Sequence, residues 1–237
     1  MPLAGLFHII CPSVSDTIFV TFKFTILRFG TEFLLYNLRS FAEIFPDVNC
    51  LVVFCKQKGH QLACLRKDSY NKSILRAAIK FLPKDTGLEI FDLEGIPPFN
   101  QNIENQPPEK VRGFKTKIRA ADAILIATPE YNYSIPGVLK NAIDWASRPY
   151  GDNAFDGKPA AVMGASIGMG GTMRAQYHLR QCFVFLNMHP INQQEVMVPF
   201  AHEKIDQSGR LTDQKTREKI RELLENLVIW TRRLEEL

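Results

Sequence analysis

Short apolar runs alternate with segments of helical periodicity from residue 69 to the end of the chain. The runs "LEIFDL", "DAILIAT", "KPAAVMGAS" and "QEVMVP" have the length and composition of strands. Longer segments with apolar residues at helical spacing separate them. Strands that alternate with helices predict an α/β fold, in which a doubly wound parallel sheet carries helices on both faces.

Five segments are expected to form the helices. "NKSILRAAIKFL" can be capped by Ser69 or Asn71 and stopped by Pro83, and the last helix begins at about Asp213. The three helices between them are predicted within "PPEKVRGFKTKIRAA", "PGVLKNAIDWAS" and "TMRAQYHLRQCFVFL".

The first sixty residues differ from the rest of the chain. Residues 1–60 are rich in Phe, Ile and Leu and lack clear helix caps, so we assign them to an atypical N-terminal extension and residues 61–237 to one domain. Charges at Asp16, Lys23 and Arg28 interrupt any membrane span, and no basic residue precedes the apolar region as a secretory signal requires.

Charge and cysteine usage narrow the class of protein. The formal net charge of +4 is mild, and Lys and Arg are spread among acids, which argues against a nucleic-acid surface. The five cysteines are odd in number and show neither a CxxC pair nor zinc-ligand spacing. We therefore expect a reduced cytoplasmic protein without a metal site and without membrane attachment.

Three loops are expected at the carboxyl edge of the sheet, where open α/β sheets bind ligands. The loop "CLRKDSYNKS" offers Arg66, Ser69, Asn71 and a helix start, which together suit a phosphate, although Ser69 and Asn71 could equally be a simple helix cap. "PEYNYS" could hold a flat heteroaromatic ring, and "SIGMGG" allows close approach of backbone to a ligand. Each of these two could also be an ordinary turn.

"LRKDSYNKS", "PEYNYSIPGVLKNAIDW" and "GKPAAVMGASIGMGG", in this order, resemble the NADPH-dependent FMN reductase family, which includes bacterial quinone and chromate reductases. The second motif is the most specific, and the resemblance runs from about Leu65 into the last helix. It implies a flavodoxin-like fold.

The resemblance also implies a cofactor site. Arg66, Ser69 and Asn71 match the positions that bind the FMN phosphate. The loop along the flavin ring is matched by Pro129, Glu130, Tyr131 and Asn132, and Ser166 matches the serine on the other side of the ring.

The activity implied is the transfer of two electrons from NADPH or NADH through FMN to a quinone or similar small-molecule acceptor, such as chromate or an azo compound. The cofactor carries this reaction, so no catalytic side chain is expected.

The resemblance further implies a homodimer or homotetramer. The apolar stripe that includes Val138 and Ile143 is wide enough to touch both the sheet and a partner, or simply packs on its own sheet.

Two alternatives follow from particular residues. Ala63 and Cys64 stand where the family has a Gly-Ser pair, so the chain could be a non-catalytic flavodoxin-like module with impaired FMN binding. The stretch "GASIG" also satisfies the pattern of a hydrolase nucleophile elbow, with Ser166 as nucleophile, but only Glu195 and His202 follow it in triad order.

Overall fold

The computed structural model describes residues 18–24, 48–54, 69–84 and 86–236. The strands are β1 (Ile18–Phe24), β2 (Val48–Phe54), β3 (Glu89–Asp92), β4 (Ala123–Ala127), β5 (Pro159–Ala165), β6 (His189–Pro190) and β7 (Val196–Val198). The α-helices are α1 (Tyr70–Lys80), α2 (Glu109–Ala120), α3 (Gly137–Ala146), α4 (Met173–Phe185), α5 (Ala201–Lys204) and α6 (Gln214–Glu235), and η2 (Gln101–Ile103) is a short 3-10 helix.

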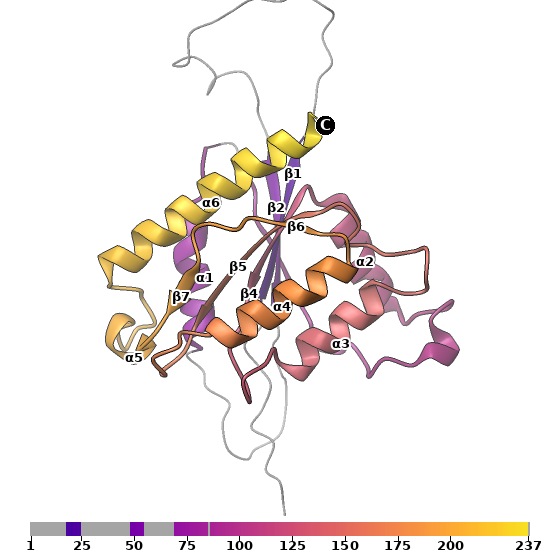
Figure 1. The fold of residues 1–237 in the computed structure, drawn as a ribbon, viewed down its shortest axis with the longest axis horizontal. Coiled ribbons are helices and arrows are strands. Elements are labelled where there is room, and N and C mark those ends of the chain that lie inside the picture. The colour runs from indigo at the N-terminus through magenta and orange to yellow at the C-terminus, as the bar shows by residue number, and fades with distance from the viewer. Residues whose placement is uncertain (1–17, 25–47, 55–68, 85, 237) are drawn as a thin grey trace, which may run out of the picture.

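The strands form one sheet in the order β2-β3-β1-β4-β5-β6, and β7 also pairs with β5. Figure 1 shows this sheet nearly edge-on, with α1 and α6 on one side and α2 and α3 on the other. The expected α/β fold with helices on both faces is therefore confirmed.

The first strand departs from the parallel arrangement. β1 runs antiparallel to β2, β3 and β4, whereas β2 is parallel to β3, and β5 is parallel to β4, β6 and β7. Antiparallel pairing needs no crossover helix, so a segment that precedes α1 can enter the sheet in the reverse direction. The sequence predicted neither β1 nor β2, and the division of the chain at residue 60 stays a prediction.

Two hydrophobic cores lie on the two faces of the sheet, because β4 and β5 send alternate side chains to opposite sides. On one face, Leu125 and Met163 pack with α1 and α6; on the other, Ile126 and Val162 pack with α2, α3 and α4. Both strands are buried along their whole length. A continuous apolar run is typical of a strand covered on both faces, and for this reason the sequence predicted both β4 and β5.

The helix stripe that includes Val138 and Ile143 faces this second core. Leu139, Ala142 and Ala146 are fully buried, and Trp145 donates its indole N–H to the carbonyl of Pro97 at 2.8 Å. The apolar face of α3 is therefore covered by the chain's own sheet.

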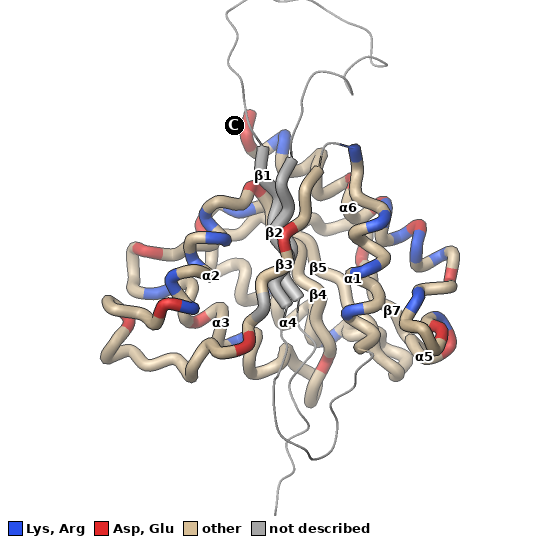
Figure 2. The backbone as a smooth tube through the Cα atoms, turned by 180° about the vertical axis from the view of Figure 1, so that it is seen from behind, with Lys and Arg blue, Asp and Glu red and all other residues tan. Residues whose placement is uncertain are grey.

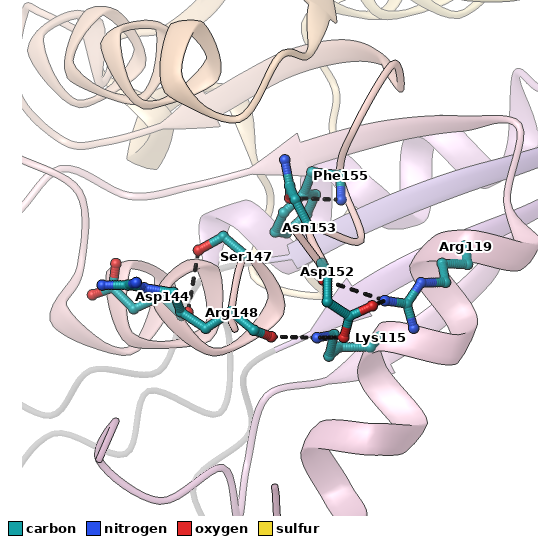
Figure 3. A network of polar contacts seen from close by, with 8 residues as sticks. All are labelled: Lys115, Arg119, Asp144, Ser147, Arg148, Asp152, Asn153 and Phe155. Atoms are coloured by element: carbon teal, nitrogen blue, oxygen red, sulfur yellow. Dashed lines mark hydrogen bonds and ion pairs between the residues drawn. The ribbon is translucent and has the colours of Figure 1, made fainter. Parts of the chain in front are cut away.

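A polar network joins α2 to the loop after α3 (Figure 3). Lys115, only 4% exposed, donates to Asp152 at 2.5 Å and to the carbonyl of Arg148, and Arg119 pairs with the same carboxylate. Because Lys115 keeps its charge partner, the buried ammonium is compensated. The network fixes the loop that leads from α3 to β5.

In the part of the chain that the structure describes, no helix is both long and apolar enough to cross a membrane.

Candidate functional site

The loop at the start of α1 meets the end of β5 through one side chain. Asn71 is 2% exposed; its carboxamide N–H donates to the carbonyl of Ala165 at 3.1 Å, and its oxygen accepts the N–H of Ala165 at 2.9 Å. Ser69 is the N-cap of α1, and its hydroxyl oxygen accepts from the N–H of Lys72 at 3.5 Å. Of the two caps that the sequence allowed, Ser69 is the one used, and Asn71 instead joins the first turn of α1 to the end of β5.

The loop after β4 meets the start of α4 through Glu130. This carboxylate accepts the backbone N–H groups of Arg174 at 2.8 Å and Ala175 at 3.1 Å, and it pairs with the Arg174 guanidinium at 3.1 Å. Thr172, the N-cap residue of α4, makes no side-chain cap bond. Glu130 therefore caps α4 from a neighbouring loop, and its negative charge lies at the positive end of the helix dipole.

A tight turn lies between these contacts. The N–H of Tyr131 donates to the carbonyl of Ser134 at 3.0 Å, and the reverse bond is 2.9 Å. Asn132 and Tyr133, the two central residues, have φ of 50° and 64°, which defines a turn of the type I′ class. Asn tolerates this conformation, but for Tyr133 it is strained. The Arg174 guanidinium lies 4.0 Å from the centroid of the Tyr133 ring and so supports it.

The glycine-rich loop after β5 is closed on itself. The hydroxyl of Ser166 accepts the N–H of Gly168 at 3.0 Å. A Cβ on Gly164 would lie 2.0 Å from the Thr172 hydroxyl and 2.4 Å from the carbonyl of Thr128, so only glycine fits where β5 approaches this loop. Gly164 lies in β5, before the loop, and its close contacts are with the protein's own backbone and side chains. That Gly168, Gly170 and Gly171 let a ligand approach the backbone stays a prediction.

The start of α1, the 129–134 loop and the glycine-rich loop thus lie together at the carboxyl edge of the sheet, where the sequence predicted them; residues 64–68 of the first loop lie outside the described residues. Asn71, Glu130, Tyr131, Asn132 and Ser166 are all in this cluster, with Pro129 buried beside Glu130 and Ser69 buried at the start of α1. Arg66 lies outside the described residues, and so do Ala63 and Cys64.

Some residues of this cluster carried no clear signal in the sequence. Arg174 lies in a predicted helix with no motif around it, and it pairs with Glu130. His178 bonds to the hydroxyl of Ser134 at 2.7 Å and ties the turn to α4. Both contacts span 44 residues of sequence, so local pattern could not reveal them.

The edge offers a surface that suits a flat ring. Tyr133 is 70% exposed, and Ile167 and Met169 of the glycine-rich loop are 59% and 83% exposed. Exposed apolar side chains gathered at one site mark a surface that binds something. Asn132, which is also exposed, supplies polar groups next to these side chains. The residues present therefore fit the ring of a flavin.

The geometry does not assemble a hydrolase triad. Among the described residues the Ser166 hydroxyl bonds only with Gly168, whereas His202 pairs with its neighbour Glu203 at 3.5 Å. The local "GASIG" pattern is thus used for a closed turn.

Comparison with known proteins agrees with this arrangement. The model of the family described as NADPH-dependent FMN reductase matches residues 62–203. An NAD(P)H-dependent FMN reductase of Pseudomonas aeruginosa is 53% identical over 72% of this chain and 92% of its own length. A 2-hydroxy-1,4-benzoquinone reductase of a Burkholderia species is 40% identical over 71% of this chain and 92% of its own.

A solved structure is similar as well. The flavoenzyme FerB of Paracoccus denitrificans, an NAD(P)H:(acceptor) oxidoreductase, superimposes with a TM-score of 0.64 at 35% identity, covering 72% of this chain and 93% of that one. The likeness therefore extends over almost the whole length of that protein.

Proposed function

From the premise that the chain belongs to the NADPH-dependent FMN reductase family, we propose that it is an NAD(P)H-dependent, FMN-containing oxidoreductase that passes two electrons to quinones. The observation that carries this function is the convergence of the α1 start, the 129–134 loop and the glycine-rich loop at one sheet edge. The fold alone would not specify an activity, so the proposal rests on this site together with the family.

The side chains named at this edge divide into two groups. Asn71 and Glu130 have their polar atoms bonded to Ala165 and to the start of α4, so they position the loops. Tyr131, Asn132 and Ser166 lie beside the exposed apolar residues and would contact the ring through backbone and side-chain polar groups. Ser69 and Arg66 would hold the phosphate end. FMN, when bound there, supplies the hydride and electron chemistry.

The protein's own contribution is rigidity and orientation. The strained turn at Tyr133 is held from two sides, by Arg174 over the ring and by His178 on Ser134. A loop fixed in this way presents the same backbone groups in every catalytic cycle, which limits the entropy lost on binding. No side chain of the cluster needs to move a proton for this role.

We further propose that two or four copies associate and that the protein is cytoplasmic. Tyr177, Val184 and Phe185 of α4 are 49%, 83% and 72% exposed, which is the kind of apolar surface that self-association covers. Light scattering on the purified protein measures this directly, and a Val184→Lys variant is expected to shift the mass toward that of a single chain.

Initial-rate kinetics test the proposed activity. NADPH and NADH oxidation is followed with 1,4-benzoquinone as acceptor, and chromate and an azo dye are compared as further acceptors. A single site that takes donor and acceptor in turn predicts parallel double-reciprocal lines. Intersecting lines would rule out that mechanism, and a preparation with bound FMN but no quinone-dependent oxidation would contradict the function.

A further inference from the structure

A cavity of about 600 Å³ lies between α1, α6 and residues 206–212, on the side of the sheet away from α2 and α3. The volume is within the range of small-molecule sites. Figure 2 shows Lys and Arg along α1, and both basic and acidic residues along α6, on this side of the molecule. The polar lining of the cavity includes Ser73, Arg76, Lys80, Asp206, Arg210 and Arg217.

Most of the positive charge in this cavity is not neutralised. Asp206 pairs with Arg210 at 3.0 Å and also accepts bonds from Ser208, so this carboxylate is satisfied within its own loop. Arg76, Lys80 and Arg217 form no ion pair with any carboxylate that the structure describes. Three cations around one concave surface attract a multiply charged anion.

The loop that carries Asp206 lies next to one of these cations. Gly209 has φ of +75°, and a Cβ placed there would lie 3.4 Å from the Arg76 guanidinium and 3.5 Å from the Ser73 hydroxyl. The positive φ favours glycine at this position, and the loop lies next to the Arg76 side chain. Arg76 is itself exposed, so its guanidinium can be reached by a ligand from solvent.

The remaining wall is apolar. Ala77, Phe81 and Leu211 line the cavity, and Ile79 beside them is 40% exposed. The guanidinium of Arg217 lies 5.7 Å from the centre of the Phe81 ring, so charge and aromatic surface are adjacent. The C-terminal end of α1 carries partial negative charge, and Lys80 in its last turn offsets it. A ligand with both an anionic group and a flat ring fits this combination.

We propose that this cavity is a second binding site, separate from the flavin edge, for a phosphate monoester of a flat ring, with Arg76, Lys80 and Arg217 on the phosphate. The two sites share α1 but use different parts of it. Ser69 caps its first turn at the flavin edge, whereas Arg76 and Lys80 lie in its second half.

Isothermal titration calorimetry with adenosine 5′-monophosphate as probe tests the site on the full chain saturated with FMN. We expect saturable binding to the wild type and a loss of affinity of about tenfold or more in Arg76→Gln/Arg217→Gln, since this variant loses two charge-assisted bonds to the phosphate. The control Lys219→Gln/Arg233→Gln removes the same charge from exposed positions of α6 outside this cavity, and should bind as the wild type does.

Three results would overturn the proposal: no binding by the wild type, equal weakening in both double variants, or inorganic phosphate binding as tightly as the nucleotide. The last would show that the apolar wall takes no part. FMN content and melting temperature establish that the variants fold. Amide chemical shifts, measured on the wild type alone, should move at residues 73–81 and 205–217 when the nucleotide is added, and shifts confined to the flavin edge would contradict the site.

Discussion

The carboxylate of Glu130 accepts the backbone N–H of Arg174 at 2.8 Å, so a residue of the 129–134 loop caps a helix that begins more than forty residues later. Removing it in Glu130→Ala should lower the free energy of unfolding by about 1 kcal/mol, as loss of a helix cap does, and weaken FMN binding because the loop loses its attachment. Urea unfolding and fluorescence titration with FMN measure the two effects.

Glu130→Gln serves as the matched variant for this prediction. The amide keeps an oxygen that can accept the N–H bonds but loses the charge that pairs with Arg174, so it should fall between the wild type and Glu130→Ala. Unchanged stability in both variants, with lost FMN affinity, would mean instead that Glu130 touches the cofactor.

Substituting Asn71 distinguishes a residue that holds the end of β5 from one that only binds the FMN phosphate. Its carboxamide is bonded on both sides to Ala165 and is buried, so Asn71→Ala should destabilise the protein by about 1–3 kcal/mol through unsatisfied backbone groups. FMN affinity should fall together with stability. A residue that only binds the phosphate would behave differently: Asn71→Ala would then reduce FMN affinity and leave the unfolding free energy as it was.

Substitution by alanine is expected to change stability in opposite directions at Gly164 and at Gly113. A Cβ at Gly164 meets the Thr172 hydroxyl at 2.0 Å, whereas at Gly113 in α2 it meets nothing within 4 Å. Gly164→Ala should therefore destabilise the protein, by about 1–3 kcal/mol as overpacking does, and Gly113→Ala should stabilise it by about 0.5–1 kcal/mol through helix propensity. Thermal melts of the two variants against the wild type give both signs, and the same sign in both would contradict the packing at the glycine-rich loop.

Acid stability should depend on Asp213, the N-cap of α6. The Thr216 hydroxyl donates a hydrogen bond to this carboxylate and thereby lowers the pKa of Asp213 below its ordinary 3.8. The folded state binds the proton less readily, so this stabilisation is complete above about pH 4 and is lost as pH falls through the lowered pKa. Asp213→Asn keeps a cap oxygen without the titration. Its unfolding free energy should change less between about pH 4 and pH 2 than that of the wild type, and equal slopes would refute the assignment.

The sequence predicted the elements whose signals are local. Ser69 before α1 and Asp213 before α6 are the observed caps, and the continuous apolar runs are β4 and β5. The two-residue β6 and the four-residue α5 were missed because a period cannot be detected over so few residues. The antiparallel β1 was missed because its segment lacks turn and cap signals that would fix its register.

The sequence predicted where the three loops lie better than it predicted what their side chains do. The three loops meet where strand ends of an α/β sheet place them, so their convergence followed from fold class. The partners of Asn71 and Glu130 could not be read, since those bonds join residues 94 and 44 positions apart and depend on how the loops fold back. Polar residues in a motif can bind a ligand or hold the loop, and only the geometry distinguishes these roles.

The absorption spectrum of the purified protein, followed by heat release and identification of the chromophore, tests the central claim most directly. The account predicts a flavin spectrum and about one FMN per chain, retained despite Ala63 and Cys64. A colourless protein that also fails to take up added FMN would contradict it and would favour a non-catalytic flavodoxin-like module.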